Sequence, residues 1–171
     1  MDLASFIRDV PDFPQKGILF KDITTLLKAA AALRETIKRM LAYCYGKEID
    51  LVAGIEARGF IFGTLLAYEL GCGFVPIRKP GKLPAKKISE TYALEYGTNT
   101  LEIHTDAVQA GQKILVVDDL LATGGTAEAA CQLIERLGGE VVGLVFAVEL
   151  NFLRGRASLK GREVFSVIAF D

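Results

Sequence analysis

Several residue types that often carry chemistry are scarce in this chain of 171 residues. The single histidine, His104, lies in a strand-like segment without a serine or cysteine partner in view, which argues against a histidine triad and favours an exposed or edge-strand position. The three cysteines, Cys44, Cys72 and Cys131, are odd in number and far apart, which argues against a disulfide framework or a zinc site. We expect each cysteine to be a small buried hydrophobe in a reducing compartment.

Long apolar runs and an excess of charge are also missing. No stretch reaches the roughly 18 consecutive apolar residues of a transmembrane helix, and residues 1–13 lack the basic start and apolar run of a signal peptide. The formal net charge of −1 provides no general attraction to nucleic acid or to an anionic membrane. We therefore expect a cytoplasmic protein with neither nucleic acid nor a membrane as a partner.

Hydrophobic residues make up 51% of the chain, enough for one sizeable core, and they alternate between strand and helix patterns. Buried strands are expected at 50–55, 73–78, 114–117, 141–148 and 164–170, and helices at 26–45, 60–70 and 127–137. This order predicts a single α/β domain over residues 1–171, with a twisted, mostly parallel sheet flanked by helices on both faces.

The segment Lys79–Thr100 has the least globular composition, with two prolines, two glycines and four lysines. This composition predicts a long flexible loop, with a β-ribbon at Tyr92–Glu95 and Asn99–Ile103 as an option. Long loops inside compact domains are uncommon and often act as lids, so we expect a lid here. The alternative is a basic loop that is simply solvated.

The segment Ile114–Thr126, ILVVDDLLATGGT, joins an apolar strand, two carboxylates, a loop of small residues and a helix. Ligands of open α/β sheets bind at the carboxyl ends of strands, and anions bind at helix N-termini. Asp118 and Asp119 offer acceptors for sugar hydroxyls or ligands for Mg²⁺, and the loop 123–126 offers backbone N–H groups to a phosphate. The combination indicates a phosphorylated ribose. The alternative is a strand end with solvated acids and a tight turn.

Two common nucleotide-binding motifs are absent from the sequence. No G-x-G-x-x-G opens a helix, so a Rossmann dinucleotide site is not supported. No G-x-x-x-x-G-K-[ST] occurs, so the phosphates are not held as in a P-loop ATPase.

The central motif VVDDLLATGGT resembles the phosphoribosyl pyrophosphate (PRPP) motif of the type I phosphoribosyltransferases. Four further segments resemble the adenine-specific members of that family: FPQKGILFKDIT at 13–24, EARGF at 56–60, RKPGKLP at 78–84 and YALEYG at 92–97. The resemblance extends from about Phe13 to Leu150 in the family's order. The PRPP motif alone is shared by many phosphoribosyltransferases, whereas the five segments together indicate the adenine-specific branch.

This resemblance implies transfer of the 5-phosphoribosyl group from PRPP to N9 of adenine, giving AMP and pyrophosphate, with Mg²⁺ as cofactor. It also implies a homodimer, a small base-binding N-terminal hood over about 1–34 and a flexible lid loop over about 79–100. Breaking the C1–oxygen bond builds positive charge on the ribose and negative charge on pyrophosphate, as in other oxocarbenium-like reactions. The protein must therefore neutralise the leaving group and exclude water.

The resemblance also assigns the phosphate-binding residues. The residues assigned to the ribose, its 5-phosphate and the metal are Asp118, Asp119, Ala122, Thr123, Gly124, Gly125 and Thr126. The residues assigned to pyrophosphate are Arg58, Arg78, Lys79 and Lys82. The family often has a cis peptide in the loop before this arginine, expected here at Ala57–Arg58. The alternative for Arg58 is a surface ion pair with Glu56.

The base and the lid are assigned in the same way. The residues expected to contact adenine are Leu19, Phe20, Lys21 and Leu150, with Leu19 and Lys21 acting through backbone groups. For Phe20 and Leu150, simple core packing is the alternative. Glu95 is the candidate acid or base at a purine ring nitrogen, a catalytic role that it shares with Arg58, and Tyr96 covers the closed site.

Two other functions stay open at this stage. The first is the same chemistry on hypoxanthine, guanine or xanthine, because the sequence cannot reveal which group faces the 6-position of the purine. The second is a regulator that senses PRPP without turnover. The absence of positive net charge and of a segment for nucleic-acid binding argues against the regulator.

Overall fold

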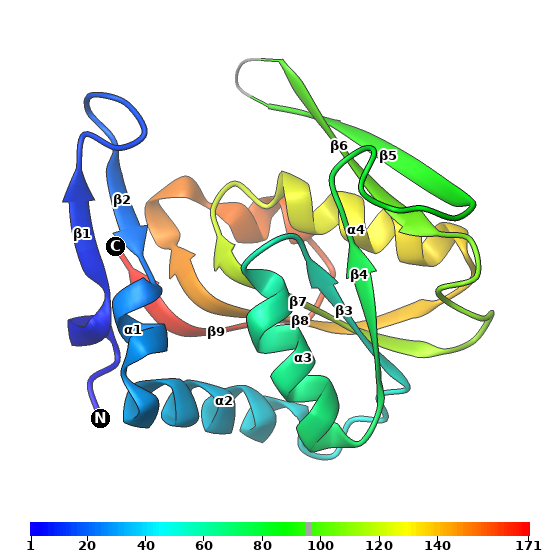
Figure 1. Cartoon of the computed structure of the whole chain (residues 1–171), viewed down its shortest axis with the longest axis horizontal. Helices are drawn as coiled ribbons and strands as arrows, with labels where there is room; N and C mark the ends of the chain where they lie inside the picture. The colour runs from blue at the N-terminus through cyan, green and yellow to red at the C-terminus, as the bar shows by residue number, and fades with distance from the viewer. Residues whose placement is uncertain (95–96) are drawn as a thin grey trace. The chain divides into compact units, whose positions relative to one another are not determined.

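In the computed structural model, which describes residues 1–94 and 97–171, the chain divides into the units Met1–Arg39 and Met40–Asp171 (Figure 1). The predicted site residues Glu95 and Tyr96 lie outside the described residues. Helix α2, Ala30–Cys44, begins in the first unit and ends in the second.

The first unit contains an antiparallel hairpin that the sequence analysis did not predict. Strand β1, Arg8–Pro11, pairs with β2, Leu19–Asp22, after the short 3₁₀ helix Ala4–Phe6. The helix expected from residue 26 begins as α1, Thr24–Lys28. It breaks at Ala29, whose backbone is extended, before α2 begins. The expected continuous helix is therefore two helices.

The second unit is built on one sheet of five parallel strands in the order β4-β3-β7-β8-β9. The strands are β3 Leu51–Ile55, β4 Gly73–Ile77, β7 Lys113–Leu121, β8 Glu140–Leu150 and β9 Val164–Phe170. All five were expected near these bounds, because a strand buried on both faces has a nearly continuous apolar sequence. The predicted α/β class and the parallel sheet are confirmed.

Helices α3, Gly59–Leu70, and α4, Gly125–Arg136, cover opposite faces of this sheet (Figure 1). Ile114 and Val116 of β7 belong to the core cluster that includes the buried face of α4. The alternate residues of the strand point to the other face, where α3 packs against β3 and β7. The chain leaves β3 toward β4 and leaves β7 toward β8. The gap between β3 and β7 is thus the switch point where open α/β sheets bind ligands.

Strand β7 is longer than expected and carries both aspartates. We expected the strand to end at Val117, but it pairs with β8 as far as Leu121. Asp118 and Asp119 therefore belong to a strand of the sheet, and the small-residue loop starts after them. Backbone pairing with a long neighbouring strand outweighs the low strand preference of aspartate.

The predicted ribbon exists and is also longer than expected. Strand β5, Lys87–Ala93, pairs with β6, Thr98–His104, as an antiparallel hairpin. Residues of β5 alternate strictly between exposed and half-buried, because Ile88 and Tyr92 pack against the core cluster of this unit. Two 3₁₀ helices, Asn151–Leu153 and Gly155–Leu159, connect β8 to β9.

The scarce residues mostly occupy the expected positions. Cys44 and Cys131 are buried, Cys72 is half-buried, and all three are free thiols. His104 ends β6, and its Nε2 accepts a hydrogen bond of 3.2 Å from the backbone N–H of Ala85. Within the described ranges, no helix combines the length and the apolar character needed to cross a membrane.

Candidate active site

A cavity of about 460 Å³ opens at the carboxyl ends of β3 and β7. Six residues singled out from the sequence line it: Arg58, Lys79, Asp118, Asp119, Ala122 and Thr126. They come from the β3–α3 loop, the segment after β4, the end of β7 and the start of α4. The parallel register, which places Gly54 opposite Val117, brings these distant segments to one edge of the sheet.

Two adjacent carboxylates line this cavity. Asp118 and Asp119 are both buried, and Oδ1 of Asp118 accepts a 2.8 Å hydrogen bond from the backbone N–H of Asp119. Burial raises the pKa of Asp118 well above its ordinary value, and the negative charge of Asp119 raises it further. Arg58 Nε lies 2.5 Å from Oδ2 of Asp119. The pair of acids is thus partly neutralised by an arginine from the neighbouring loop.

Glu56, the alternative ion-pair partner considered for Arg58, is bonded to other residues. Glu56 accepts hydrogen bonds from Arg78 at 3.2 Å and from the backbone N–H of Lys79 at 2.8 Å. Burial opposes ionisation of Glu56, but these two donors outweigh it and lower its pKa. Through Glu56, these two hydrogen bonds join the β3–α3 loop to the segment that carries Arg78 and Lys79. Arg78 and Lys82, which the resemblance assigned to pyrophosphate, are absent from the described residues that line the cavity.

The cis peptide lies one residue earlier than expected, at Glu56–Ala57 and not at Ala57–Arg58. The backbone N–H of Glu56 still donates to the Ile77 carbonyl, as a continuation of the strand pairing, at 2.9 Å. Arg58 already has helical backbone angles at the N-cap of α3. The chain must therefore change direction between these two residues, which places the turn at Glu56–Ala57.

Close backbone packing shapes this end of the site. A Cβ atom on Gly59, the first residue of α3, would lie 2.9 Å from Oδ1 of Asp118 and 2.9 Å from the Val117 carbonyl oxygen. Only glycine therefore lets α3 start so close to the carboxylate of Asp118. This close approach explains the glycine of the EARGF segment.

The loop after β7 forms a smaller cavity of about 70 Å³ beside the first. Four of the five residues expected to bind phosphate line it: Ala122, Thr123, Gly124 and Thr126. Gly124 has φ +85°, and the fifth residue, Gly125, begins α4. Backbone N–H groups at a helix N-terminus, together with the helix dipole, attract anions.

The segment between β8 and β9 supports this loop, a contribution that the sequence analysis missed. A Cβ on Gly124 would lie 2.4 Å from the Gly155 carbonyl oxygen, and a Cβ on Gly155 would lie 2.4 Å from that of Ala122. Ser158 Oγ donates a 2.7 Å hydrogen bond to the carbonyl oxygen of Thr123. The glycine of LRGRAS, residues 153–158, was the only sign in the sequence of this close packing. The sequence could not show which loop this glycine would contact.

An ion pair with one buried partner, the carboxylate of Glu149, holds the supporting segment in place. Arg156 donates to the carboxylate of Glu149 from Nε at 2.7 Å and from Nη2 at 2.8 Å. Its Nη1 donates to the Val164 carbonyl at 3.0 Å. Glu149 is only 3% exposed and pairs with Leu121 of β7 in the sheet. The pair therefore ties the supporting segment to the sheet beside the loop of residues 122–126, which we call the phosphate loop after its expected ligand.

In the first unit, the residues expected to contact the base lie on β2. The ring of Phe20 packs edge-on against Phe13, with centroids 5.2 Å apart, and Lys21 Nζ lies 2.7 Å from Oδ1 of Asp9. Leu19 is exposed at the start of the strand. Leu150, the fourth residue expected to contact the base, ends β8 in the second unit and is buried.

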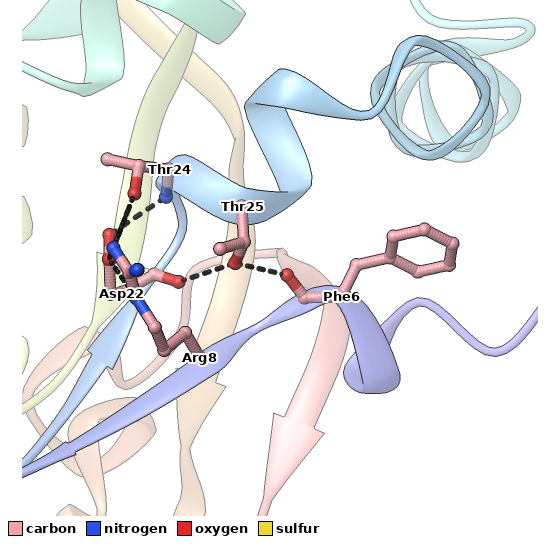
Figure 2. A network of polar contacts seen from close by, with 5 residues as sticks. All are labelled: Phe6, Arg8, Asp22, Thr24 and Thr25. Atoms are coloured by element: carbon pink, nitrogen blue, oxygen red, sulfur yellow. Dashed lines mark hydrogen bonds and ion pairs between the residues drawn. The ribbon is translucent and has the colours of Figure 1, made fainter.

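A polar network fixes the end of β2 (Figure 2). The carboxylate of Asp22 accepts hydrogen bonds from the backbone N–H and the hydroxyl of Thr24, both at 2.9 Å, and from Arg8 Nε at 3.0 Å. These contacts lower the pKa of Asp22 to about 2, and the Thr24 backbone N–H contributes most. Thr25 Oγ1 donates to the Phe6 carbonyl at 2.6 Å. The strand therefore leads into α1 through a turn that the Asp22 carboxylate and the Thr25 hydroxyl hold in place.

Comparison with known proteins identifies this arrangement. The family model of the phosphoribosyl transferase domain matches residues 20–168. An adenine phosphoribosyltransferase of Thermotoga sp. (strain RQ2) is 59% identical over 170 residues, covering 99% of this chain and 100% of that protein. The enzyme of that name from Halothermothrix orenii is 60% identical over 168 residues, covering 98% and 99%.

Solved structures agree with the sequence relatives. The crystal structure of adenine phosphoribosyltransferase from Thermoanaerobacter pseudethanolicus matches with a TM-score of 0.96 at 54% identity, covering 99% of this chain and 98% of that one. The Saccharomyces cerevisiae enzyme, solved with adenine and an imino-altritol bisphosphate, matches with a TM-score of 0.92 at 39% identity, covering 97% and 96%. The chain belongs to the phosphoribosyltransferase family and, within it, to the adenine phosphoribosyltransferases.

Proposed function

We propose that this chain transfers the 5-phosphoribosyl group of PRPP to N9 of adenine and releases pyrophosphate and AMP. The observation that carries the proposal is the 460 Å³ cavity at the sheet's switch point. It combines two carboxylates, two cationic side chains and the N-terminal turn of a helix, which match the sugar, the diphosphate and the 5-phosphate of one substrate.

The ribose 5-phosphate half of the substrate lies over β7 and the start of α4. Backbone N–H groups of residues 122–126 and the hydroxyls of Thr123 and Thr126 donate to the phosphate, which accepts hydrogen bonds only. Asp118 and Asp119 accept from the ribose hydroxyls. Because both carboxylates are buried, they reach the sugar without losing a large water shell at the moment of binding.

The diphosphate lies toward the β3–α3 loop. Arg58 and Lys79 line the cavity and neutralise the charge that develops on the leaving group as the C1–oxygen bond breaks. Arg78 holds Glu56 and so positions the peptide that carries Lys79. Lys82, also assigned to pyrophosphate with Arg78, would act from the segment before β5.

The two aspartates also fit a magnesium ion. Adjacent carboxylates at a cavity wall match the preference of Mg²⁺ for one or two carboxylates together with substrate phosphates. Asp118 and Asp119 would hold the ion directly or through water, and when bound it supplies positive charge to the diphosphate. The cofactor proposed here is therefore Mg²⁺.

Adenine is expected against β2, with Leu19 and Lys21 offering backbone groups and Phe20 and Leu150 offering apolar faces. Glu95 acts as the acid or base at a ring nitrogen of the purine, and Tyr96 covers the site. We expect Glu95→Gln to lower kcat more than it weakens PRPP binding. The opposite pattern in steady-state kinetics and PRPP titration would make Glu95 a binding residue.

The decisive experiment is a pyrophosphate-release assay with PRPP, Mg²⁺ and a panel of adenine, hypoxanthine, guanine, xanthine and uracil. Release with adenine alone supports the proposal. Release with a 6-oxo purine would assign a different base. Binding of PRPP without turnover on any purine would indicate a sensor. The cytoplasmic location and the homodimer remain predictions; light scattering tests the homodimer.

A further inference from the structure

Tyr92, on the hairpin strand β5, contacts the first turn of α4. Its hydroxyl lies 2.8 Å from Oγ1 of Thr126. Its ring covers Gly125, since a Cβ on that glycine would lie 3.2 Å from Cδ2 of the tyrosine. Both Tyr92 and Thr126 line the 460 Å³ cavity. A residue of the lid segment therefore touches the very turn that receives the 5-phosphate.

The direction of this hydrogen bond is set by the ligand. A threonine hydroxyl has one proton to donate and two lone pairs that accept, and so does the tyrosine hydroxyl. A phosphate oxygen can only accept, so Thr126 must direct its proton to the phosphate. Tyr92 must then donate to Thr126. Such a chain of hydrogen bonds ending on an anion polarises each member and strengthens the bond to the phosphate.

The rest of β5 is attached to the same helix. Arg136, in the last turn of α4, donates to the Ser89 carbonyl at 2.7 Å and to the carboxylate of Glu90 at 3.0 Å. The hairpin strand is therefore held at two points along α4, and Tyr92 is the contact at the phosphate end. Tyr92 is thus the side chain that joins Thr126 to the hairpin.

We propose that Tyr92 is a positioning residue that directs the Thr126 hydroxyl to the 5-phosphate and links occupancy of the phosphate loop to the β5–β6 hairpin. The inference rests on the proposed function, because it requires a phosphate in that loop. It adds a residue of the lid segment to the ribose 5-phosphate half of the site.

The test is Tyr92→Phe, which keeps the ring over Gly125 and removes only the hydroxyl. Calorimetric titration with ribose 5-phosphate should show Kd raised about three- to tenfold, the loss expected for one hydrogen bond. Titration with pyrophosphate and Mg²⁺ should change less than twofold. In steady state, KM for PRPP should rise while KM for adenine stays constant. In a Thr126→Val background, Tyr92→Phe should have no further effect.

Hydrogen exchange tests the link to the hairpin directly. Ribose 5-phosphate should increase protection of the β5 amides in the native protein and not in Tyr92→Phe, and pyrophosphate should do so in neither. The matched control is Tyr45→Phe, which removes the same hydroxyl from a side chain that is 92% exposed just after α2. It should bind ribose 5-phosphate as the native protein does.

The results separate the inference from the function beneath it. If the native protein fails to bind ribose 5-phosphate, the proposed use of the loop is wrong and the inference fails with it. If the native protein binds and Tyr92→Phe binds equally well, only the positioning role is wrong. Equal weakening for ribose 5-phosphate and pyrophosphate would also overturn it, because that pattern indicates a general disturbance of the cavity.

Discussion

Arg58 Nε lies 2.5 Å from Oδ2 of Asp119, although the two residues are 61 positions apart in the chain. Arg58 is the N-cap of α3, after β3, and Asp119 lies near the end of β7. An arginine assigned to the leaving group thus pairs with a carboxylate assigned to the ribose. Under the proposed function, substrate binding would exchange this ion pair for contacts with the diphosphate and the sugar, and so couple the two halves of the site.

Removing the carboxylate of Asp119 should abolish most of the transferase activity. We expect Asp119→Ala to lower kcat/KM by about two to three orders of magnitude, the usual cost of losing a group aimed at transition-state charge, while circular dichroism shows an intact fold. The control is Asp106→Ala, an exposed carboxylate in the turn after β6. Kinetics of Asp119→Ala close to those of the control would contradict the assigned role.

Gly155→Ala tests the support of the phosphate loop. The added methyl would lie 2.4 Å from the Ala122 carbonyl oxygen, and such overpacking costs about 1–3 kcal/mol of stability. Urea unfolding should show this loss, and ribose 5-phosphate binding should weaken. Gly161→Ala is the comparison, because it has φ +84° and no neighbour within 4 Å. It should lose stability through backbone strain with unchanged ligand binding; equal binding by both variants would refute the support.

Arg156→Gln should destabilise the protein in a pH-dependent way. The arginine lowers the pKa of Glu149 below its ordinary value of 4.5, against the opposing effect of burial. A lowered pKa in the folded state stabilises above that ordinary value, and the stabilisation disappears as the pH falls. We expect a loss of about 1–3 kcal/mol at pH 7, less than for a fully buried pair because Arg156 is 53% exposed.

The measurement is urea unfolding of native and variant protein between pH 7 and pH 3. Their difference should shrink as the pH falls below 4.5, where Glu149 is protonated in the unfolded chain. Lys160→Gln, an exposed cation in the same connection, should show no such difference. A gap that stays constant across this range would mean that the effect of Arg156 is packing alone.

Asp22→Ala should affect the base more than PRPP. The carboxylate fixes the end of β2, where the base is expected, so its loss should raise KM for adenine several-fold more than KM for PRPP. The pKa of Asp22, about 2, lies below its ordinary value of 3.8. The stabilisation that the ionised carboxylate gives to the end of β2 is therefore complete above pH 4 and is lost only as the pH falls toward 2. Asp9→Ala, which removes only the ion pair to Lys21, should leave KM for adenine unchanged if Lys21 acts through its backbone.

Chelation of Mg²⁺ should stop turnover. If Asp118 and Asp119 serve metal-bound PRPP, excess EDTA should reduce pyrophosphate release to background, and added Mg²⁺ should restore it. Undiminished release in EDTA would exclude metal-bound PRPP as the substrate.

Local pattern was enough to predict the sheet strands and the phosphate loop, because each depends on contiguous residues. The apolar segment after residue 50 and the acidic pair followed by TGGT carry their structure within a few positions. Element ends were less certain: β7 continues through Asp119 because β8 pairs beside it. The hairpin β1–β2 was missed, because β1 ends on a proline and a loop with a second proline separates it from β2.

The sequence by itself determined the α/β class, the order of its elements and the chemical character of the proposed ribose 5-phosphate site, since these follow from periodicity and from a continuous motif. Only the tertiary structure decided which side chains meet. Arg58 pairs with Asp119 and leaves Glu56 to Arg78, Gly155 supports Ala122, and Tyr92 reaches Thr126. These contacts join segments far apart in the chain, and parallel strands bring such segments together only when the whole sheet has formed.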